Sequence, residues 1–131
     1  GKWVSGAELR HWYQRAQLVL NINQWDTGDL SGANLRVADV PACGSVLLSE
    51  YTPDLDSIFR IGVELSIFGS PQEMSARAQD LLRDTQRRHA LEAAGLAAVR
   101  RLGSYRDRMR TLIEDFQALT ASGPRRPGGG S

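Results

Sequence analysis

The sequence has few cysteines and histidines, and its positive and negative charges nearly balance. Its single cysteine, Cys43, excludes an internal disulfide framework and fits a reducing compartment. The two histidines, His11 and His89, show no metal-ligand spacing with any Cys, Asp or Glu, so we expect no metal site. The formal net charge of +1 gives no general argument for nucleic acid or for acidic partners.

Long apolar runs are missing as well. No stretch approaches the roughly 20 apolar residues that span a membrane, and residues 1–10 lack the apolar core of a signal peptide. We therefore expect a soluble, cytoplasmic chain with no transmembrane segment.

What is present suffices for one domain. The chain has 131 residues, of which 41% are hydrophobic, enough to enclose one core. Residues 122–131 contain no apolar side chain to bury. We therefore expect a single domain over residues 1–120 and a disordered tail over 121–131.

Short apolar runs alternate with helical patterns in the first half of the chain. The runs at 18–22, 45–49 and 63–68 predict about three strands, the last near a sheet edge. Helices are predicted after the capping box that begins at Ser5, over 34–42, and from Thr52 through Phe59. Strands separated by helices indicate an α/β fold with a parallel sheet.

The C-terminal third reads as helical from the capping box at 70–73 to Leu119. Residues 83–110 contain eight arginines against three acids, which favours a solvated face over contact with anionic lipid or a polyanionic acceptor. Nucleic acid is not an expected partner, because the one aromatic residue there falls on the expected buried side of the last helix. That side comprises Tyr105, Met109, Leu112, Ile113, Phe116 and Leu119.

The most informative stretch is a loop, a short helix, a glycine and a buried strand, over residues 31–49. The loop Ser31-Gly32-Ala33-Asn34 would present backbone N–H groups to phosphate at the start of a helix. Arg36 could reach a phosphate oxygen, although a helix arginine is more often solvated. Asp39, one turn further on, could accept hydrogen bonds from a pair of sugar hydroxyls.

This stretch resembles a known family. Residues 34–44 (NLRVADVPACG) with Leu47 and Leu48 are similar to the "R-x-F-E/D-x-x-A-C-G … L-L" segment of group 1 glycosyltransferases, especially the spore-maturation CgeB-type branch. Residues 9–23, 55–68 and 103–108 are similar to further family segments, including its "G-x-E" and its closing "H-T-Y-x-x-R". The resemblance runs in order from about residue 7 to about residue 113.

The resemblance implies a Rossmann-like, three-layer fold, with this chain as the second half of the C-terminal nucleotide-sugar-binding domain of a two-domain GT-B enzyme. The missing N-terminal acceptor domain would come from the rest of the enzyme or from a partner chain. A fragment should leave the apolar faces of its first two helices exposed, form concentration-dependent oligomers and transfer no sugar alone. A complete small domain is the alternative.

The resemblance also implies site roles. It makes Asp39 the ribose ligand of a nucleoside-diphosphate sugar and Glu64 the glutamate of "G-x-E", for which a structural role is expected. Related enzymes carry a second glutamate, near the donor sugar, where this chain has Ser31. A serine supplies no carboxylate, so sugar recognition by that group is in doubt.

Other polar residues have less specific interpretations. Asn21 and Asn23 end the first strand, where α/β sheets bind ligands, although turn chemistry explains them equally well. Cys43 is interpreted as a packing residue before Gly44 and not as a nucleophile, because no histidine partner is recognisable.

Two functions follow. The chain is either the donor-binding part of a glycosyltransferase that needs no covalent cofactor, or a non-catalytic interaction module that keeps the fold. The catalytic residues, the donor sugar and base, and the acceptor are not determined by the sequence.

Overall fold

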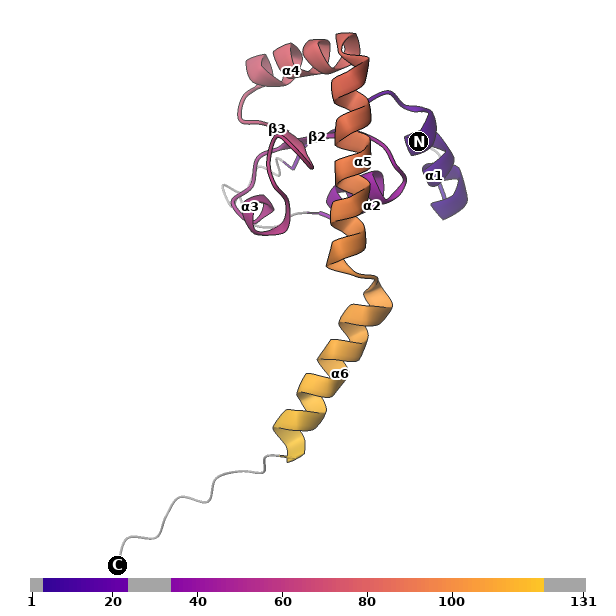
Figure 1. Cartoon of the computed structure of the whole chain (residues 1–131), viewed down its shortest axis with the longest axis vertical. Helices are drawn as coiled ribbons and strands as arrows, with labels where there is room; N and C mark the ends of the chain where they lie inside the picture. The colour runs from indigo at the N-terminus through magenta and orange to yellow at the C-terminus, as the bar shows by residue number, and fades with distance from the viewer. Residues whose placement is uncertain (1–3, 24–33, 122–131) are drawn as a thin grey trace, which may run out of the picture.

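The structure is a computed structural model that describes residues 4–23 and 34–121 (Figure 1). Three strands, β1 (Val19–Asn21), β2 (Leu47–Glu50) and β3 (Ser66–Phe68), form a parallel sheet in the order β1-β2-β3. Leu48 in the central strand pairs with Leu20 on one side and Ser66 on the other. The predicted α/β fold with a small parallel sheet is confirmed.

Six helices complete the described part of the chain. Three are short elements around the sheet, namely α1 (Gly6–Arg15), α2 (Arg36–Ala42) and α3 (Leu55–Ile58). The C-terminal part is helical, as predicted, and consists of α4 (Pro71–Arg83), α5 (Thr85–Leu102) and α6 (Tyr105–Ala121). No helix in the described ranges is long and apolar enough to cross a membrane.

Helices cover both faces of the sheet. Because strand residues alternate between faces, Leu47 and Val46 point in opposite directions. Leu47 belongs to the main core, whose buried members are Val37, Val40, Leu47, Leu55, Phe59, Leu65 and Ala98. Val46 packs instead with Leu81 of α4 and Leu91 of α5 in a second cluster. The layers are therefore α2 with α5, the sheet, and α4.

A glycine allows the closest approach between these layers. Gly95 of α5 is buried against α2 and the turn before β3. A Cβ atom there would lie 3.0 Å from the carbonyl oxygen of Glu64 and 3.3 Å from Cβ of Pro41. Any larger residue would push α5 away from the sheet.

Several boundaries differ from the sequence prediction. The helix expected from Thr52 begins at Leu55, and Thr52 itself is buried. The third strand begins at Ser66 because residues 60–65 form a turn, in which the Gly62 N–H bonds to the Leu65 carbonyl. Ser5 is the N-cap residue of α1 but makes no side-chain cap bond, so the first capping box is wrong.

Other capping predictions are confirmed. The Ser70 hydroxyl accepts a hydrogen bond from the Glu73 N–H at 3.2 Å, and proline follows the cap. Ser104 and Asp107 cap α6 reciprocally: the Ser104 N–H donates to the Asp107 carboxylate at 2.8 Å, and the Asp107 N–H donates to the Ser104 hydroxyl at 3.3 Å.

Two helices leave their apolar side chains exposed. Helix α1 has no buried residue, and Trp12 is 58% exposed. The predicted buried side of α6 is exposed along its whole length. Conversely α2, expected to present an uncovered apolar face, buries Val37, Val40 and Pro41 against the core. The expectation of exposed apolar faces on the first two helices therefore holds for α1 and is wrong for α2.

Candidate functional site

A hydrogen-bonded polar cluster lies at the carboxyl ends of β1 and β2. Its centre is Asn21, the last residue of β1, whose side chain is fully buried. The Asn21 amide nitrogen donates to the Ser49 hydroxyl at 3.0 Å and to the Asn23 side-chain oxygen at 3.2 Å. The last residue of β1 is polar because the strand ends at the edge where the loop leaves the sheet.

The oxygen of the same amide connects the sheet to α2. The side-chain oxygen of Asn21 accepts from Nδ2 of Asn34 at 2.8 Å and from Nη1 of Arg36 at 3.0 Å. Asn34 also donates to the Asn23 side-chain oxygen at 2.6 Å. Asn21 thereby positions Asn34 and Arg36, two of the residues predicted to contact phosphate. Turn chemistry alone does not explain these hydrogen bonds.

The start of α2 is shaped by Asn34. The Asn34 side-chain oxygen accepts a hydrogen bond from the Arg36 N–H at 3.1 Å, in the manner of a capping asparagine. The first helical residue is Arg36, two residues later than the predicted start at 34. Ser31, Gly32 and Ala33, the rest of the predicted phosphate loop, lie outside the described residues.

The neighbouring loops add polar groups at the same edge. The carboxylate of Glu50, at the end of β2, accepts the Asn23 N–H at 2.7 Å. Among the described residues, Nδ2 of Asn23 and the hydroxyl of Thr52 are buried without a hydrogen-bond partner. This edge therefore holds more hydrogen-bonding capacity than its own internal contacts use.

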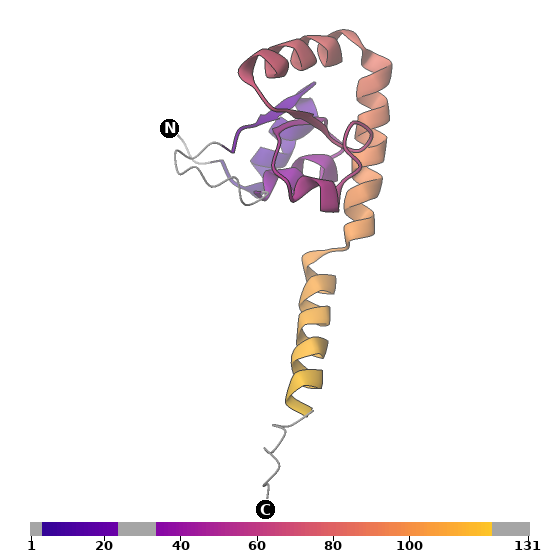
Figure 2. The same ribbon diagram turned by 90° about the vertical axis from the view of Figure 1, so that its left-hand side faces the viewer.

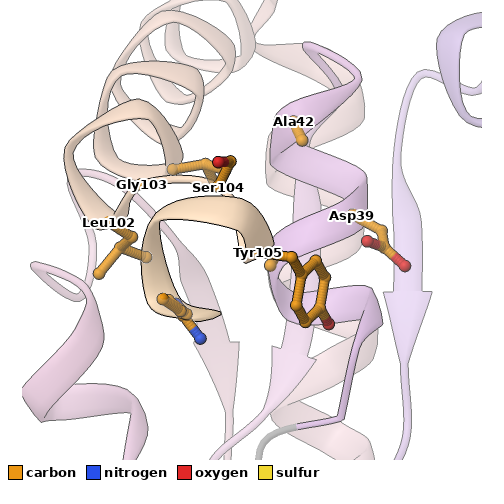
Figure 3. Close-up of a pocket in the computed structure, with 9 residues that line it drawn as sticks. Asp39, Ala42, Leu102, Gly103, Ser104 and Tyr105 are labelled. Atoms are coloured by element: carbon orange, nitrogen blue, oxygen red, sulfur yellow. The ribbon is translucent and has the colours of Figure 1, made fainter. Parts of the chain in front are cut away.

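Asp39 does not join this cluster. It lies on the exposed side of α2 and lines a cavity of about 230 Å³ that is closed by the end of α5 and the start of α6 (Figure 3). Figure 3 shows the ring of Tyr105 alongside α2 on the Asp39 side. The complete lining is Ala38, Asp39, Ala42, Val99, Leu102, Gly103, Ser104, Tyr105 and Arg108.

The cavity unites two segments, 38–42 and 99–108, that are far apart in the sequence. Sequence reasoning singled out 34–44 and 103–108 as family-like, but it gave no site role to Tyr105 or Arg108 and expected Tyr105 to be buried. Tyr105 is instead 68% exposed, which corrects that expectation. The sequence signal for Tyr105 and Arg108 was the closing motif at 103–108. Only the fold shows that this motif lies beside α2.

Cys43 has the environment of a packing residue. It follows α2, is half-buried, and its pKa is raised, chiefly by burial and further by the nearby Asp39 carboxylate. A raised pKa keeps the thiol protonated at neutral pH, which disfavours a nucleophilic role. Within the described residues no group of three or more His, Cys, Asp or Glu is arranged to hold a metal ion.

Glu64 makes structural contacts, the role expected of it. It is buried between two arginines: Arg101 of α5 binds both carboxylate oxygens, at 3.0 and 3.2 Å, and Nε of Arg60 donates at 2.8 Å. These hydrogen bonds, that of Arg101 foremost, lower the pKa of Glu64 to about 2. The ion pair ties α5 to the turn before β3.

The arginine-rich stretch is only partly a solvated face. Arg88 is buried, and its guanidinium donates to the carbonyl oxygens of Leu81 and Leu82 at 2.6 and 2.7 Å. Arg101 pairs with Glu64 as described, and Arg110 lies 3.7 Å from the Asp107 carboxylate. The expectation of a solvated face therefore holds for the other seven arginines, which are exposed, and is wrong for Arg88.

Fold and site together define a class of protein. A Rossmann-like α/β sheet carries at its carboxyl edge, where such sheets bind ligands, a polar cluster with an arginine, and a cavity with a carboxylate lies beside α2, α5 and α6. A family model described as glycosyl transferase-like matches residues 1–114. The chain belongs to this glycosyl transferase-like family, and its general role is glycosyl transfer. No curated protein and no solved structure matches it significantly.

Proposed function

We propose that this chain provides the donor contacts of a glycosyltransferase that moves a sugar from a nucleoside-diphosphate carrier to an acceptor. The diphosphate binds at the loop formed by Ser31, Gly32, Ala33 and Asn34 and to Arg36, and the ribose binds to Asp39. The observation that carries the proposal is the arrangement on α2, where Arg36 lies at the carboxyl edge of the sheet and Asp39 at the cavity.

The spacing along α2 suits a nucleotide. Three helical residues separate Arg36 from Asp39, a rise of about 4.5 Å, or slightly less than one turn. Diphosphate and ribose are directly linked in a nucleotide, so one ligand can contact both side chains. A carboxylate that accepts two vicinal hydroxyls forms charge-assisted hydrogen bonds, each contributing about 1.5–3 kcal/mol.

The chemistry assigned to this half-site is electrostatic. When the bond between sugar and diphosphate breaks, negative charge grows on the leaving phosphate oxygens. The Arg36 guanidinium is a positively charged donor that lowers the energy of that charge. Asn21 holds the arginine in place before the ligand arrives, which reduces the entropy lost on binding.

The finer assignments rest on the sequence resemblance. We propose that the chain is a second half of a GT-B donor domain of the CgeB-type branch, acting in the cytoplasm. The acceptor site then comes from an N-terminal domain or a partner chain.

A second candidate function is a non-catalytic module that retains the fold. Ser31 favours it, because the related enzymes carry a glutamate near the donor sugar at that position. The two candidates differ in one measurable property, since only the donor-binding protein needs affinity for nucleoside diphosphates.

Calorimetry with UDP and GDP tests the ribose assignment. We expect Asp39→Asn to weaken binding by roughly tenfold or more. A 2′,3′-dideoxy analogue should bind the unchanged protein comparably weakly and lose little further affinity with the variant, because the partner hydroxyls are absent. Asp80→Asn, which neutralises an exposed acid on α4, is the matched control and should change nothing.

Three outcomes count against the proposal. If neither UDP nor GDP binds the unchanged chain, the interaction-module function is favoured. If Asp39→Asn leaves binding unchanged, or weakens the dideoxy ligand equally, Asp39 is not the ribose ligand. Turnover of a UDP- or GDP-sugar by residues 1–131 alone would contradict the division of the site between two domains.

A further inference from the structure

Helix α6 presents a continuous apolar stripe to solvent. It extends away from the α/β body as a separate arm, and no other described helix lies along it (Figures 1 and 2). Six large apolar side chains on it are between 52% and 75% exposed. They are Tyr105, Met109, Leu112, Ile113, Phe116 and Leu119.

The spacing of this stripe is that of a coiled-coil seam. Tyr105, Met109, Leu112, Phe116 and Leu119 are separated by four, three, four and three residues. This alternation places them at successive d and a positions of a heptad repeat and predicts a partner helix. An apolar seam on a protruding helix is energetically unfavourable in water, which favours association.

Charges beside the seam indicate which helix fits. With Met109 at an a position, Arg108 and Asp115 occupy the two g positions of α6. In an antiparallel pair of identical helices, g positions face each other across the seam. A register in which Met109 lies opposite Leu112 of the second copy also places Arg108 opposite Asp115 of the second copy, twice by symmetry.

The same register completes the apolar layers. Tyr105 lies opposite Phe116 of the second copy, and Ile113 flanks the seam at an e position, on the side away from Arg108 and Asp115. Shifting the antiparallel pair by one heptad would instead set Asp115 against Asp115, a repulsive contact. A parallel pair would place Arg108 beside Ile113 and Asp115 beside Thr120, with no opposite charges in contact.

We propose that α6 is a self-association element, which pairs antiparallel with α6 of a second copy of this chain in the register that joins Arg108 to Asp115. The contact surface is the seam from Tyr105 to Phe116. It lies on the arm and, at the base of the arm, shares Tyr105 and Arg108 with the lining of the Asp39 cavity.

Sedimentation of the full chain between about 10 µM and about 1 mM tests the association. We expect a concentration-dependent monomer–dimer equilibrium, and Leu112→Glu should weaken it by at least about tenfold. The unfolding midpoint of the monomer should not change, because Leu112 is exposed. Gln117→Glu adds the same charge on the same helix away from the seam and should leave the equilibrium unchanged.

A charge exchange tests the register. Arg108→Glu and Asp115→Arg should each weaken the dimer by placing like charges together, and the double variant should restore it.

Several results would overturn the proposal. A monomer at every concentration shows that another molecule, or nothing, covers this face. A dimer insensitive to Leu112→Glu is formed elsewhere on the chain. Failure of the double charge exchange to restore the dimer excludes the antiparallel register.

Discussion

The carboxylate of Glu64 lies beneath the surface between Arg60 and Arg101, whose own side chains are largely exposed. Its pKa in the folded protein is about 2, against 4.5 for a free glutamate. A lowered pKa means that the charged form stabilises the fold. That stabilisation is complete above the pKa of the unfolded chain and is lost as the pH falls from there through about 2.

We therefore expect Glu64→Gln to lower the free energy of unfolding by at most about 3 kcal/mol at pH 7, with water around the exposed arginines reducing that figure. The difference from the unchanged protein should shrink as the pH falls below 4.5 and vanish only below the pKa of about 2, where Glu64 is itself neutral. Urea unfolding of both proteins across this range measures it. Glu114→Gln, an exposed acid on α6, should show no such convergence.

Arg88, like Glu64, is a charged residue whose side chain is buried. It supplies donors to the last carbonyl groups of α4, which have no partner within their own helix, and it also donates to the Thr85 hydroxyl at 3.1 Å. The positive charge therefore lies against the negative end of the α4 dipole. This side chain joins α4 to α5 at the corner between them.

Replacing Arg88 with alanine should destabilise the protein by about 2–4 kcal/mol, because buried carbonyls lose their donors and a cavity opens. Chemical denaturation measures the change. Its neighbour Arg87 has an exposed side chain, so Arg87→Ala should cost less than about 0.5 kcal/mol. Equal effects of the two substitutions would show that the contacts of Arg88 contribute nothing.

At the scale of elements, the packing of α5 on α2 fixes the layer that carries Arg36 and Asp39. Helix propensity alone would favour alanine over glycine in the interior of α5 by about 1 kcal/mol. The glycine at 95 is explained by the backbone of Glu64 and the ring of Pro41, which leave no room for a Cβ atom. The close approach also brings Arg101 within reach of Glu64.

Gly95→Ala should therefore destabilise the fold by about 1–3 kcal/mol in spite of the better helix former. The control is Gly6→Ala in α1, where an added Cβ meets nothing within 4 Å, and it should be neutral or slightly stabilising. Thermal unfolding of the two variants measures both changes in stability. A stabilised Gly95→Ala protein would mean that α5 shifts without cost.

At the scale of the whole molecule, the α/β body and the α6 arm are distinct in their burial. Every described side chain of α6 is exposed, whereas the body contains both core clusters. The arm meets the body at its base, where Tyr105 and Arg108 line the cavity beside Asp39.

A chain that ends at Ser104 should keep the folding stability of the body within about 0.5 kcal/mol, because no core contact is removed. It should also lose self-association and bind nucleoside diphosphates more weakly, since the cavity loses one wall. Calorimetric unfolding, sedimentation and ligand titration of the shortened chain measure the three effects. A marked loss of stability would place α6 within the cooperative core.

Local patterns were sufficient for much of the fold. The apolar runs predicted the three strands to within a few residues, and the caps at Ser70 and Ser104 were predicted because capping depends on residues three positions apart. The Ser5 cap and the start of α3 were wrong: Ser5 makes no side-chain cap bond, and Thr52 is buried three residues before the helix begins. The buried side of α6 was wrong for a related reason. Periodicity shows that a face is apolar but not whether the chain itself covers it.

The candidate site was likewise only partly predictable from the sequence. The sequence by itself determined the α/β class, the family resemblance and the presence of Arg36 and Asp39 on one short helix, because each depends on residue type and near-neighbour spacing. Only the tertiary structure decided that Asn21 bridges Asn34 and Arg36, that Tyr105 and Arg108 line the same cavity as Asp39, and that Arg88 is buried. Those contacts join residues whose separation along the chain says nothing about distance until the sheet and helices have packed.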